Sequence, residues 1–427
     1  MAQKNELPDF ADEIARICAD IYKRRKGVHY DASLLAETAG TLLKGVYAGY
    51  GKDFISVGWD TPDLPMLSRL TQNVFSFSAA KNYQELRTIT DALRDEDGKL
   101  RDFQDFKEEV GVINDKFNKV WLQTEYDTAI ATATQSARWQ EFKTEKAIFP
   151  FLRYQTAGDD SVRDEHRLLD GITKRVDDPF WRTYYPPNGW HCRCEAIQVP
   201  EDEAQETPEG SYRTPPVPEL FRTNVGETGL IFPRTHPYYM GVPNMEIRKA
   251  IAYLPPENAY LELRGKRNVP VNLHVMHGVG ELQGNLEVIN DLIAVKPGIK
   301  EVSLLPEIHS KDNALKPKFY PDGWKFHNKD KNADAVVNFG KKAKWVVDIK
   351  RLQGNAGHLK KHLEKAAQQA DYAIIKLSDE ELKTGLNKLK STVNFHLKIT
   401  DLKGVIIIGN DGSLVYESYK IQPPIKK

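Results

Sequence analysis

A proline-rich polar stretch between Val199 and Tyr239 separates two parts of the chain with different residue patterns. It contains an acidic run over 201–203 and prolines at 215, 216 and 218, a composition typical of an extended linker. Because 427 residues exceed what one hydrophobic core usually organises, we expect more than one folded unit. The predicted domains are 1–200 and 271–427, joined by a linker over 201–270. The alternative is a proline-rich arm that packs over a neighbouring surface.

The formal net charge of zero hides an asymmetry between the two parts. Residues 296–427 contain 25 Lys and Arg against 15 Asp and Glu, whereas residues 1–295 contain 35 against 45. A basic C-terminal part indicates a polyanionic partner, for which nucleic acid is the usual candidate. A solvated lysine-rich surface would give the same count.

The three cysteines, Cys18, Cys192 and Cys194, are too few for a disulfide framework, and the last two are too close for an unstrained bridge. They are predicted to be thiols or metal ligands. No stretch approaches the roughly 18 apolar residues of a membrane-spanning helix, and the N-terminus has no signal-peptide core. We therefore expect synthesis in the cytoplasm and no membrane partner.

The fold class predicted is a mainly α N-terminal module followed by an α/β domain with a mixed sheet. Apolar residues recur at helical spacing from Asp12 to Arg25, and residues 30–145 continue in long helical patterns. Residues 155–199 are dense in turn formers and aromatics, which indicates an irregular folded module. Beyond 270 the predicted order is α-β-β-β-α-β, followed by a helix over 380–389 and another strand.

Four short motifs in the irregular module carry a resemblance to a known family. They are Arg163-Asp164-Glu165-His166, Asp178-Pro179-Phe180-Trp181, Pro186-Pro187-Asn188 and Cys192-Arg193-Cys194. Over about 40–200 the chain resembles the phage Mu F-like head morphogenesis family. This resemblance implies a minor head protein that associates with portal and capsid proteins of a phage or prophage, and it implies no catalytic role for this half.

The same motifs contain side chains that suit a metal ion. His166, His191, Cys192 and Cys194 are ligand types that close tetrahedral zinc sites, which predicts a structural zinc. The Cys-x-Cys spacing is unlike the usual C-x₂-C knuckle. The alternative is that His166 hydrogen-bonds the proline-rich loop while the two cysteines pack as small apolar groups.

The strongest chemical signal in the second half is Asp334 followed by Asp348-Ile349-Lys350. In a strand over 345–350 side chains alternate, so Asp348 and Lys350 share one face. A hairpin turn near 339–342 would place Asp334 opposite residue 347 or 348, about 5–6 Å away. Adjacent carboxylates repel each other unless a cation or a proton neutralises them, which predicts a site for Mg²⁺ or Mn²⁺, or for Zn²⁺. A surface ion pair on an edge strand is the alternative.

Residues 275–420 resemble PD-(D/E)XK nucleases, in particular the C-terminal toxin domains of CdiA proteins of contact-dependent inhibition. The resemblance rests on 302–307, 332–337, 345–350 and 365–371. It implies a polymorphic toxin with catalytic Asp334, Asp348 and Lys350, a further metal-binding acid at Glu307, and a helix-borne support residue at Gln369. Aspartate at 348 and an insertion over 309–330 depart from the family pattern, and Glu287 competes with Glu307 as the further acid.

A helix over 358–370 is predicted to bury Leu359, Leu363, Ala366 and Ala370. Lys360, Lys361 and Lys365 then face outward, where they can contact phosphates.

The leading hypothesis is a virion protein that carries a DNase or tRNase toxin, active in the bacterial cytoplasm and paired with an immunity protein. Two alternatives stay open. One is a purely structural minor capsid protein with an inert DNA-contacting tail, and the other is a metal-independent RNase tail of barnase or colicin type.

Overall fold

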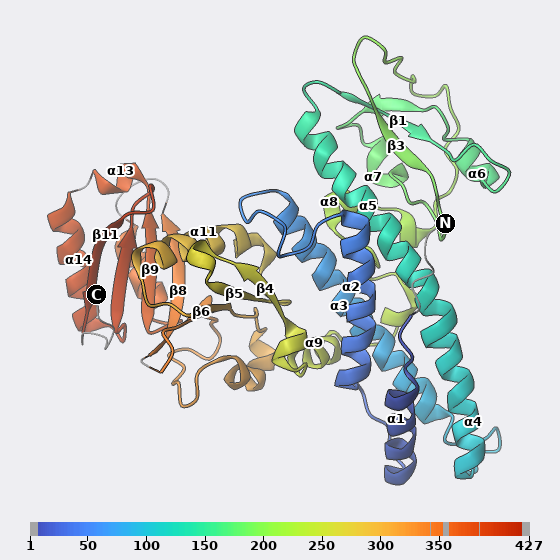
Figure 1. Ribbon diagram of the computed structural model, residues 1–427, viewed down its shortest axis with the longest axis horizontal. Coiled ribbons are helices and arrows are strands. Elements are labelled where there is room, and N and C mark those ends of the chain that lie inside the picture. Colours follow the sequence, from blue (N-terminus) through green and yellow to red (C-terminus); the bar gives the residue numbers. More distant parts are fainter. Residues whose placement is uncertain (1–6, 342, 353–357, 384, 421–427) are drawn as a thin grey trace. The chain divides into compact units, whose positions relative to one another are not determined.

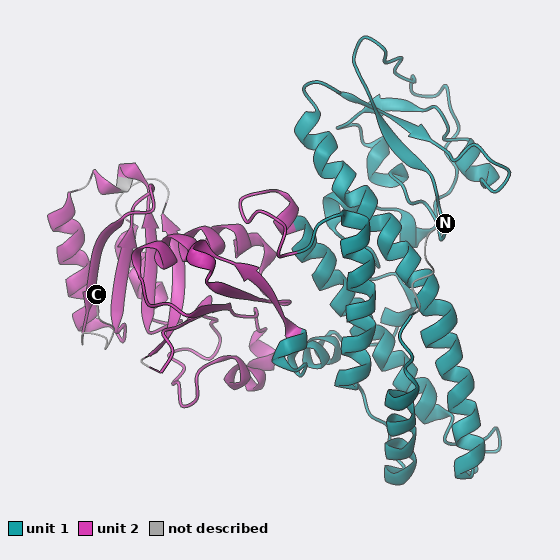
Figure 2. Cartoon of the chain, in the orientation of Figure 1, with its two compact units in different colours: residues 1–53, 66–258 teal, residues 54–65, 259–427 magenta. Residues whose placement is uncertain are grey.

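The computed structural model describes residues 7–341, 343–352, 358–383 and 385–420 (Figure 1). It divides into two compact units, of which unit 1 comprises residues 1–53 and 66–258 and unit 2 comprises residues 54–65 and 259–427 (Figure 2). The main boundary therefore follows residue 258 and lies beyond the proline-rich stretch.

Unit 1 is built on long helices, as predicted. They are α1 (Ala11–Arg24), α2 (Ala32–Tyr50), α3 (Asp63–Asp91), α4 (Phe103–Asn114), a π-helix (Asp115–Trp121) and α5 (Leu122–Glu145). The backbones of α2 and α5 come close together at Gly49, where a Cβ atom would lie 2.2 Å from the carbonyl oxygen of Ile130. A larger residue at 49 would force the two helices apart.

A small antiparallel sheet follows the helices, in a region for which the sequence indicated only an irregular module. Its strands are β1 (Phe151–Gln155), β2 (Thr173–Arg175) and β3 (Glu195–Val199), in the order β2-β1-β3, and the connections contain the short helices α6 (Asp164–Arg167) and α7 (Phe180–Tyr184). Asp178 caps α7 by accepting a hydrogen bond from the backbone of Phe180 at 2.7 Å. Trp139, Trp181 and Tyr185 are buried in the core of this region.

The prediction of a linker over 201–270 is wrong for residues 201–258, which pack on the helices of unit 1. Asn73 on α3 exchanges two hydrogen bonds with the backbone of Phe232, and the rings of Phe77 and Phe232 stack with their centroids 3.8 Å apart. Apolar residues between the prolines, such as Phe221 and Ile231, are buried. The average composition of the segment hid these anchors. Its elements are η2 (Glu219–Phe221), α8 (Val225–Thr228), η3 (Pro237–Tyr239), α9 (Asn244–Ala252) and α10 (Pro256–Ala259).

Unit 2 contains an eight-stranded mixed sheet in the order β11-β10-β9-β8-β7-β6-β5-β4. The strands are β4 (Tyr260–Arg264), β5 (Pro270–His274), β6 (Glu301–Leu304), β7 (Ala335–Asn338), β8 (Lys344–Leu352), β9 (Tyr372–Leu377), β10 (Gly404–Ile408) and β11 (Leu414–Tyr419). The predicted alternation of helices and strands is confirmed from 279 to 408. Strands β4, β5 and β11 were not predicted, and β4 lies inside the segment that was expected to be a linker.

Helices cover both faces of this sheet. On one face lies α11 (Val279–Val295), and on the other lie α12 (Leu359–Ala366) and α14 (Leu386–Ile399), whose apolar residues form a core with Leu352, Ala373 and Ile375. The predicted helix over 358–370 ends four residues early. The predicted helix over 380–389 is instead α13 (Asp379–Leu382) and the start of α14, which is preceded by Gly385 at a φ of 94°.

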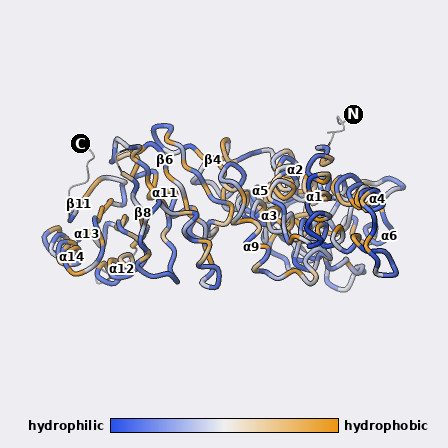
Figure 3. The backbone as a smooth tube through the Cα atoms, turned by 90° about the horizontal axis from the view of Figure 1, so that it is seen from below, coloured by the Kyte–Doolittle hydropathy of each residue, from blue (hydrophilic) through white to orange (hydrophobic). Residues whose placement is uncertain are grey.

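Figure 3 shows that apolar and polar residues alternate along the chain and do not gather in one long apolar segment. In the part of the chain that the structure describes, no helix combines the length and apolar character needed to span a membrane.

Candidate active site

The β7–β8 hairpin places Asp334 beside Asp348. Ala335 pairs with Val347, and the backbone N–H of Asp334 donates to the carbonyl of Val347 at 3.0 Å, which extends the antiparallel register by one residue. The carboxylate of Asp334 accepts a hydrogen bond from the backbone N–H of Ile349 at 2.6 Å. The register that the sequence predicted therefore brings these two aspartates together at the start of β7.

Lys350 lies on the same face of β8 as Asp348, as side-chain alternation predicts. Its Nζ atom is 2.7 Å from Oδ1 of Asp348 and 3.9 Å from Oδ2 of Asp334. Asp348 is fully buried, whereas 13% of the Asp334 side chain and 21% of the Lys350 side chain stay exposed. Solvent therefore reaches the cluster from the side of Asp334 and Lys350.

Burial and mutual repulsion perturb all three groups. Burial raises the pKa of Asp334 to about 6, although Lys350 opposes this shift. Burial together with the neighbouring charge of Asp334 raises the pKa of Asp348 to about 7. Burial alone would lower the pKa of Lys350, but the two carboxylates outweigh it and raise that pKa. The cluster thus gains or loses protons near neutral pH, as catalytic and metal-binding carboxylates often do.

A pocket of about 460 Å³ opens at this cluster. Its walls come from the loop before α11, the first turn of α11, the loop after β6, the segment before β7, and β8. The lining residues are His277, Gly278, Val279, Gly280, Glu281, Leu305, Pro306, Glu307, Asp330, Lys331, Asn332, Ala333, Asp334, Lys350 and Gln369. Four of the five predicted site residues thus line one cavity, namely Asp334, Lys350, Glu307 and Gln369. The fifth, Asp348, is buried 2.7 Å from Lys350.

Glu281 is an acid of this pocket that the sequence reasoning missed. It lies in the first turn of α11, and its charge raises the pKa values of both Asp334 and Asp348. The sequence pattern predicts this helix only over 284–294, which leaves Glu281 outside any expected element. The sequence did contain a signal for an earlier helix start, because Glu281 follows Gly278 by three residues and acidic residues favour the first turn of a helix.

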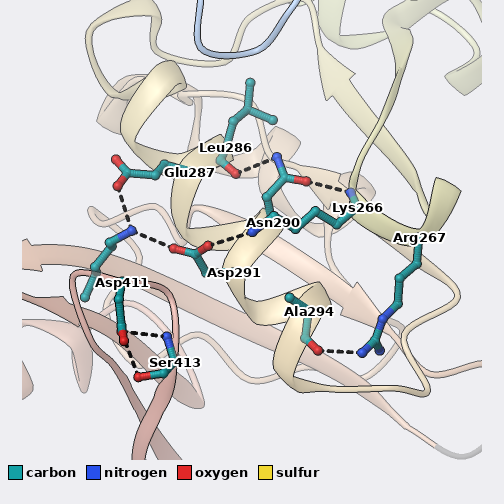
Figure 4. Close-up of polar contacts among 10 residues, drawn as sticks. Lys266, Arg267, Leu286, Glu287, Asn290, Asp291, Ala294, Asp411 and Ser413 are labelled. Carbon is teal, nitrogen blue, oxygen red and sulfur yellow. Dashed lines mark hydrogen bonds and ion pairs between the residues drawn. The ribbon is translucent and has the colours of Figure 1, made fainter.

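Glu307 and Glu287 lie in different surroundings. Glu307 is exposed at the pocket rim, where its Oε2 atom would be 3.3 Å from a Cβ atom at Gly278. Glu287, the rival acid, points to the other side of the sheet and pairs with Arg351 at 2.9 Å and Lys376 at 2.7 Å. Figure 4 shows this second polar cluster, in which Glu287 and Asp291 lie on the same helix. Glu287 is therefore not part of the pocket.

Gln369 lines the pocket but is not carried by a helix, because α12 ends at Ala366 and Gln369 lies in the turn that follows. Its amide nitrogen lies 3.5 Å from the carbonyl of Lys365. The prediction of a helix-borne residue is thus corrected to a turn residue at the same cavity.

The insertion over 309–330 is a folded segment beside the pocket. Its aromatic residues, Tyr320 among them, pack with Val336, Val346 and Ala370. Trp324 and His327 both hydrogen-bond to the carboxylate of Asp371, at 3.1 and 3.0 Å. The insertion therefore positions residues 330–332, which form one wall of the cavity.

Lys360, Lys361 and Lys365 are exposed on α12, and the four predicted apolar residues of this segment are buried. Lys360 lies 3.9 Å from Glu364, a weak surface ion pair. Burial lowers the pKa of His362 on the same helix, and the charges of Lys350, Lys365 and Lys361 lower it further. Lys361 and Lys365 of α12 and Lys350 of the pocket therefore all lie close enough to His362 to lower its pKa.

In unit 1, the structure groups three of the four predicted zinc ligands. One ligand atom from each of His166, Cys192 and Cys194 lies within 4.8 Å of the others, and all three residues are buried. His191 is exposed and lies outside this group. A hydrogen bond with Cys194 lowers the pKa of Cys192 to about 4, and a hydrogen bond with His166 contributes to this shift.

Comparison with known proteins finds a similarity over one part of the chain. Residues 80–197 match the family model "Phage Mu protein F like protein". The chain is 37% identical over 73 residues to the "Putative capsid assembly protein F" of Escherichia phage Mu, which is 17% of each protein. It is also 37% identical over 84 residues to the "Mu-like prophage FluMu F protein" of Haemophilus influenzae, or 20% of each.

These matches span at most a fifth of either relative's length. No solved structure matches the chain. The family model covers α5, all four sequence motifs and the small sheet of unit 1 except the last two residues of β3, and it overlaps neither segment of unit 2. Residues 80–197, called the Mu F-like domain, are therefore the part of the chain that is similar to phage Mu protein F.

Proposed function

We propose that this chain is a phage head-assembly protein whose unit 2 is a metal-dependent nuclease. The head-assembly role is supported by the matched domain, because one relative is described as a putative capsid assembly protein. Portal and capsid proteins are then the partners of unit 1, and the phage head is where the protein resides. The nuclease role rests on unit 2 alone and is argued from its pocket.

The observation that carries the nuclease proposal is the cluster of Asp334, Asp348 and Lys350, of which Asp334 and Lys350 line one solvent-accessible cavity. Two neighbouring carboxylates on a sheet repel each other, which lowers the stability of the folded protein. Such a pair is typical of a catalytic or metal-binding site. A lysine within reach of both supplies a positive charge for a phosphate oxygen. Hydrolysis of a phosphodiester uses this combination of groups.

The residues fit a divalent cation. Among the described residues, Oδ2 of Asp348 is buried and has no hydrogen-bond partner, which leaves one oxygen available to a ligand in the cluster. Asp334 and Asp348 would hold a hard ion such as Mg²⁺ or Mn²⁺, with Glu281 or Glu307 completing the oxygen ligands. Once bound, such an ion polarises a phosphodiester oxygen and lowers the pKa of a coordinated water.

The remaining residues would orient and bind the substrate. Lys350 is held by Asp348, so its ammonium group stays directed toward the pocket. Lys360, Lys361 and Lys365 on α12 would contact phosphates of the strand without reading its sequence. DNA and tRNA both present backbone phosphates of this kind, so both are candidate substrates. A toxin of this kind requires an immunity protein in the cell that makes it.

The test is cleavage by the full-length protein of plasmid DNA and of tRNA, with Mg²⁺ or Mn²⁺ and with EDTA. We expect one substrate to be cut only when metal is present, and the Asp348→Asn protein to leave both intact. Asp348→Asn also controls for a contaminating nuclease, because a contaminant would cut in both preparations.

The two alternatives give different results in this assay. An inert DNA-contacting tail would cut neither substrate under any condition. A metal-independent RNase would cut tRNA in EDTA and would not depend on Asp348. Either result would overturn the metal-dependent proposal.

A further inference from the structure

Three side chains of the Mu F-like domain converge on one buried point that the nuclease proposal does not involve. Nδ1 of His166 lies 3.5 Å from Sγ of Cys194 and 3.7 Å from Sγ of Cys192. His166 comes from α6, whereas both cysteines come from the loop that leads into β3. The contact therefore joins two segments that are 26 residues apart in the sequence.

These distances agree with the geometry of a tetrahedral zinc site. Zinc binds thiolate sulfur at about 2.3 Å and imidazole nitrogen at about 2.0–2.1 Å. With a tetrahedral angle between them, two such ligand atoms lie roughly 3.6 Å apart. Both nitrogen-to-sulfur distances here are within about 0.1 Å of that separation.

Hydrogen bonding within the protein does not account for both contacts. Nδ1 of an imidazole carries at most one proton, so it donates to one sulfur or accepts from one thiol at a time. The second sulfur atom, at nearly the same distance, then has no hydrogen bond with Nδ1 at that moment. Cys192 and Cys194 are free thiols in the structure, and their spacing in the chain disfavours a bridge between them. A cation at the centre would satisfy all three atoms together.

We propose that His166, Cys192 and Cys194 bind one zinc ion in the Mu F-like domain. Among the described residues the site has three protein ligands, and its fourth tetrahedral position stays open to a non-protein ligand. Each of the three residues is more than nine-tenths buried, which limits access of a substrate to the ion. The zinc therefore has a structural role in this domain.

The protein holds the ligands in place through contacts on either side of them. Arg193, between the two cysteines, pairs with both carboxylate oxygens of Asp159 at 2.6 and 2.7 Å. Arg163 donates to the carbonyl of Trp190. These two bridges attach the cysteine loop to the segment that carries His166, so the ligand atoms are already close together before an ion binds.

His191 provides a matched control because it is the adjacent histidine of the same loop. It has a positive φ of 55° and an exposed side chain, and it lies outside the cluster. Cys18 is a second control, because it is a buried free cysteine on α1, far from this loop in the sequence.

The experiment measures the metal content of the full-length protein expressed in zinc-supplemented medium and of four variants. We expect one zinc per chain in the wild type, in His191→Ala and in Cys18→Ser. We expect loss of that zinc in Cys192→Ser and in His166→Ala. Cobalt substitution gives a second readout, because thiolate-to-cobalt charge transfer reports sulfur ligands and the oxygen pocket of unit 2 cannot produce it.

The folding consequence gives a readout that does not depend on metal analysis of the variants. A chelator should lower the thermal midpoint of the wild type and of His191→Ala, and it should leave Cys192→Ser unchanged. The proposal is overturned if wild type and Cys192→Ser contain the same zinc, or if the cobalt-loaded wild type shows no charge-transfer band. Failure of nuclease activity would not affect either outcome.

Discussion

Lys350 and Arg351 are neighbours in β8, yet they pair with carboxylates on opposite faces of the sheet. Lys350 lies 2.7 Å from Asp348 in the pocket, whereas Arg351 lies 2.9 Å from Glu287 on the α11 side. Lys376 of β9 joins the second group and is 2.6 Å from Asp291. One strand therefore contributes to two separate charged clusters, and the first of them opens into a cavity of about 460 Å³.

This separation predicts different effects for two glutamates of α11. Glu281→Gln should lower the nuclease rate by about 10-fold or more, because Glu281 lines the pocket and its carboxylate can bind the metal. Glu287→Gln should leave the rate within about twofold, because its partners are Arg351 and Lys376. Initial rates at saturating Mn²⁺ and the metal concentration for half-maximal rate measure both. Equal losses in the two variants would contradict this division of roles.

The core of the candidate site was predictable because its determinants are local. Side-chain alternation along 345–350 and a short turn before it are enough to bring Asp334, Asp348 and Lys350 together. Glu281 was not predictable in this way. It lies in the first turn of α11, where Gly278 and Gly280 interrupt the helical pattern, and it reaches the pocket through the packing of a whole helix on a sheet.

The elements of the fold were likewise predictable where they depend on local sequence and not where they depend on tertiary contacts. Strands with regular apolar spacing could be predicted, and the strand that the sequence predicts over 372–377 is β9 (Tyr372–Leu377). The segment 201–258 was misread, since prolines and acidic residues dominate its composition while single anchors such as Phe232 hold it on α3. Tertiary contacts of this kind leave no periodic signal.

Asp348→Asn should stabilise the metal-free protein at pH 8. The folded-state pKa of Asp348 is about 7, above the ordinary value of 3.8, so the folded state binds more protons and stability falls as pH rises from about 4 to 7. An asparagine removes this cost, which we expect to be roughly 1–3 kcal/mol at pH 8 and near zero at pH 4. Calorimetry of the full-length protein in EDTA at both pH values measures it.

The same variant should lose the response to metal. Mn²⁺ should raise the wild-type transition more at pH 8 than at pH 6, since protons compete for the carboxylates, and should not raise that of Asp348→Asn. The prediction is wrong if, in EDTA at pH 8, the wild type has a higher free energy of unfolding than Asp348→Asn. Ionised Asp348 would then not destabilise the folded protein.

The lysines of α12 should affect nucleic-acid affinity and its salt dependence. Replacing Lys360, Lys361 and Lys365 by Gln should reduce the slope of log K against log salt by up to about 3 for duplex DNA, or somewhat less for single strands. The control replaces three other exposed lysines, Lys383, Lys388 and Lys398, which removes the same charge. Binding is measured by anisotropy in Ca²⁺ or EDTA, so that no cleavage occurs. Equal slopes for the two triple variants would exclude α12 as the binding surface.

In unit 1, a buried charge network surrounds Lys81 in the helical core. Nζ of Lys81 lies 2.6 Å from Oε2 of Glu125, and the two side chains are only 1% and 4% exposed. Nearby Glu85 is also buried and accepts a hydrogen bond from Asn118, at the centre of the π-helix, and burial raises the pKa of Glu85 to about 7. Lys81→Met would leave buried carboxylates without their cation, which typically costs about 3–5 kcal/mol.

This loss should depend on pH and should be recoverable. Since the pKa of Glu85 is already about 7, Glu85 can protonate at pH 5.5, so the destabilisation should be smaller there than at pH 8. Lys81→Met with Glu125→Leu should recover part of the stability, because the unpaired charge is then removed with its partner. Hydrogen exchange of the α3 and α5 amides, followed by mass spectrometry, reports this unit alone. A destabilisation by Lys81→Met below about 1 kcal/mol at pH 8 would mean that the ion pair is dispensable for the helical core.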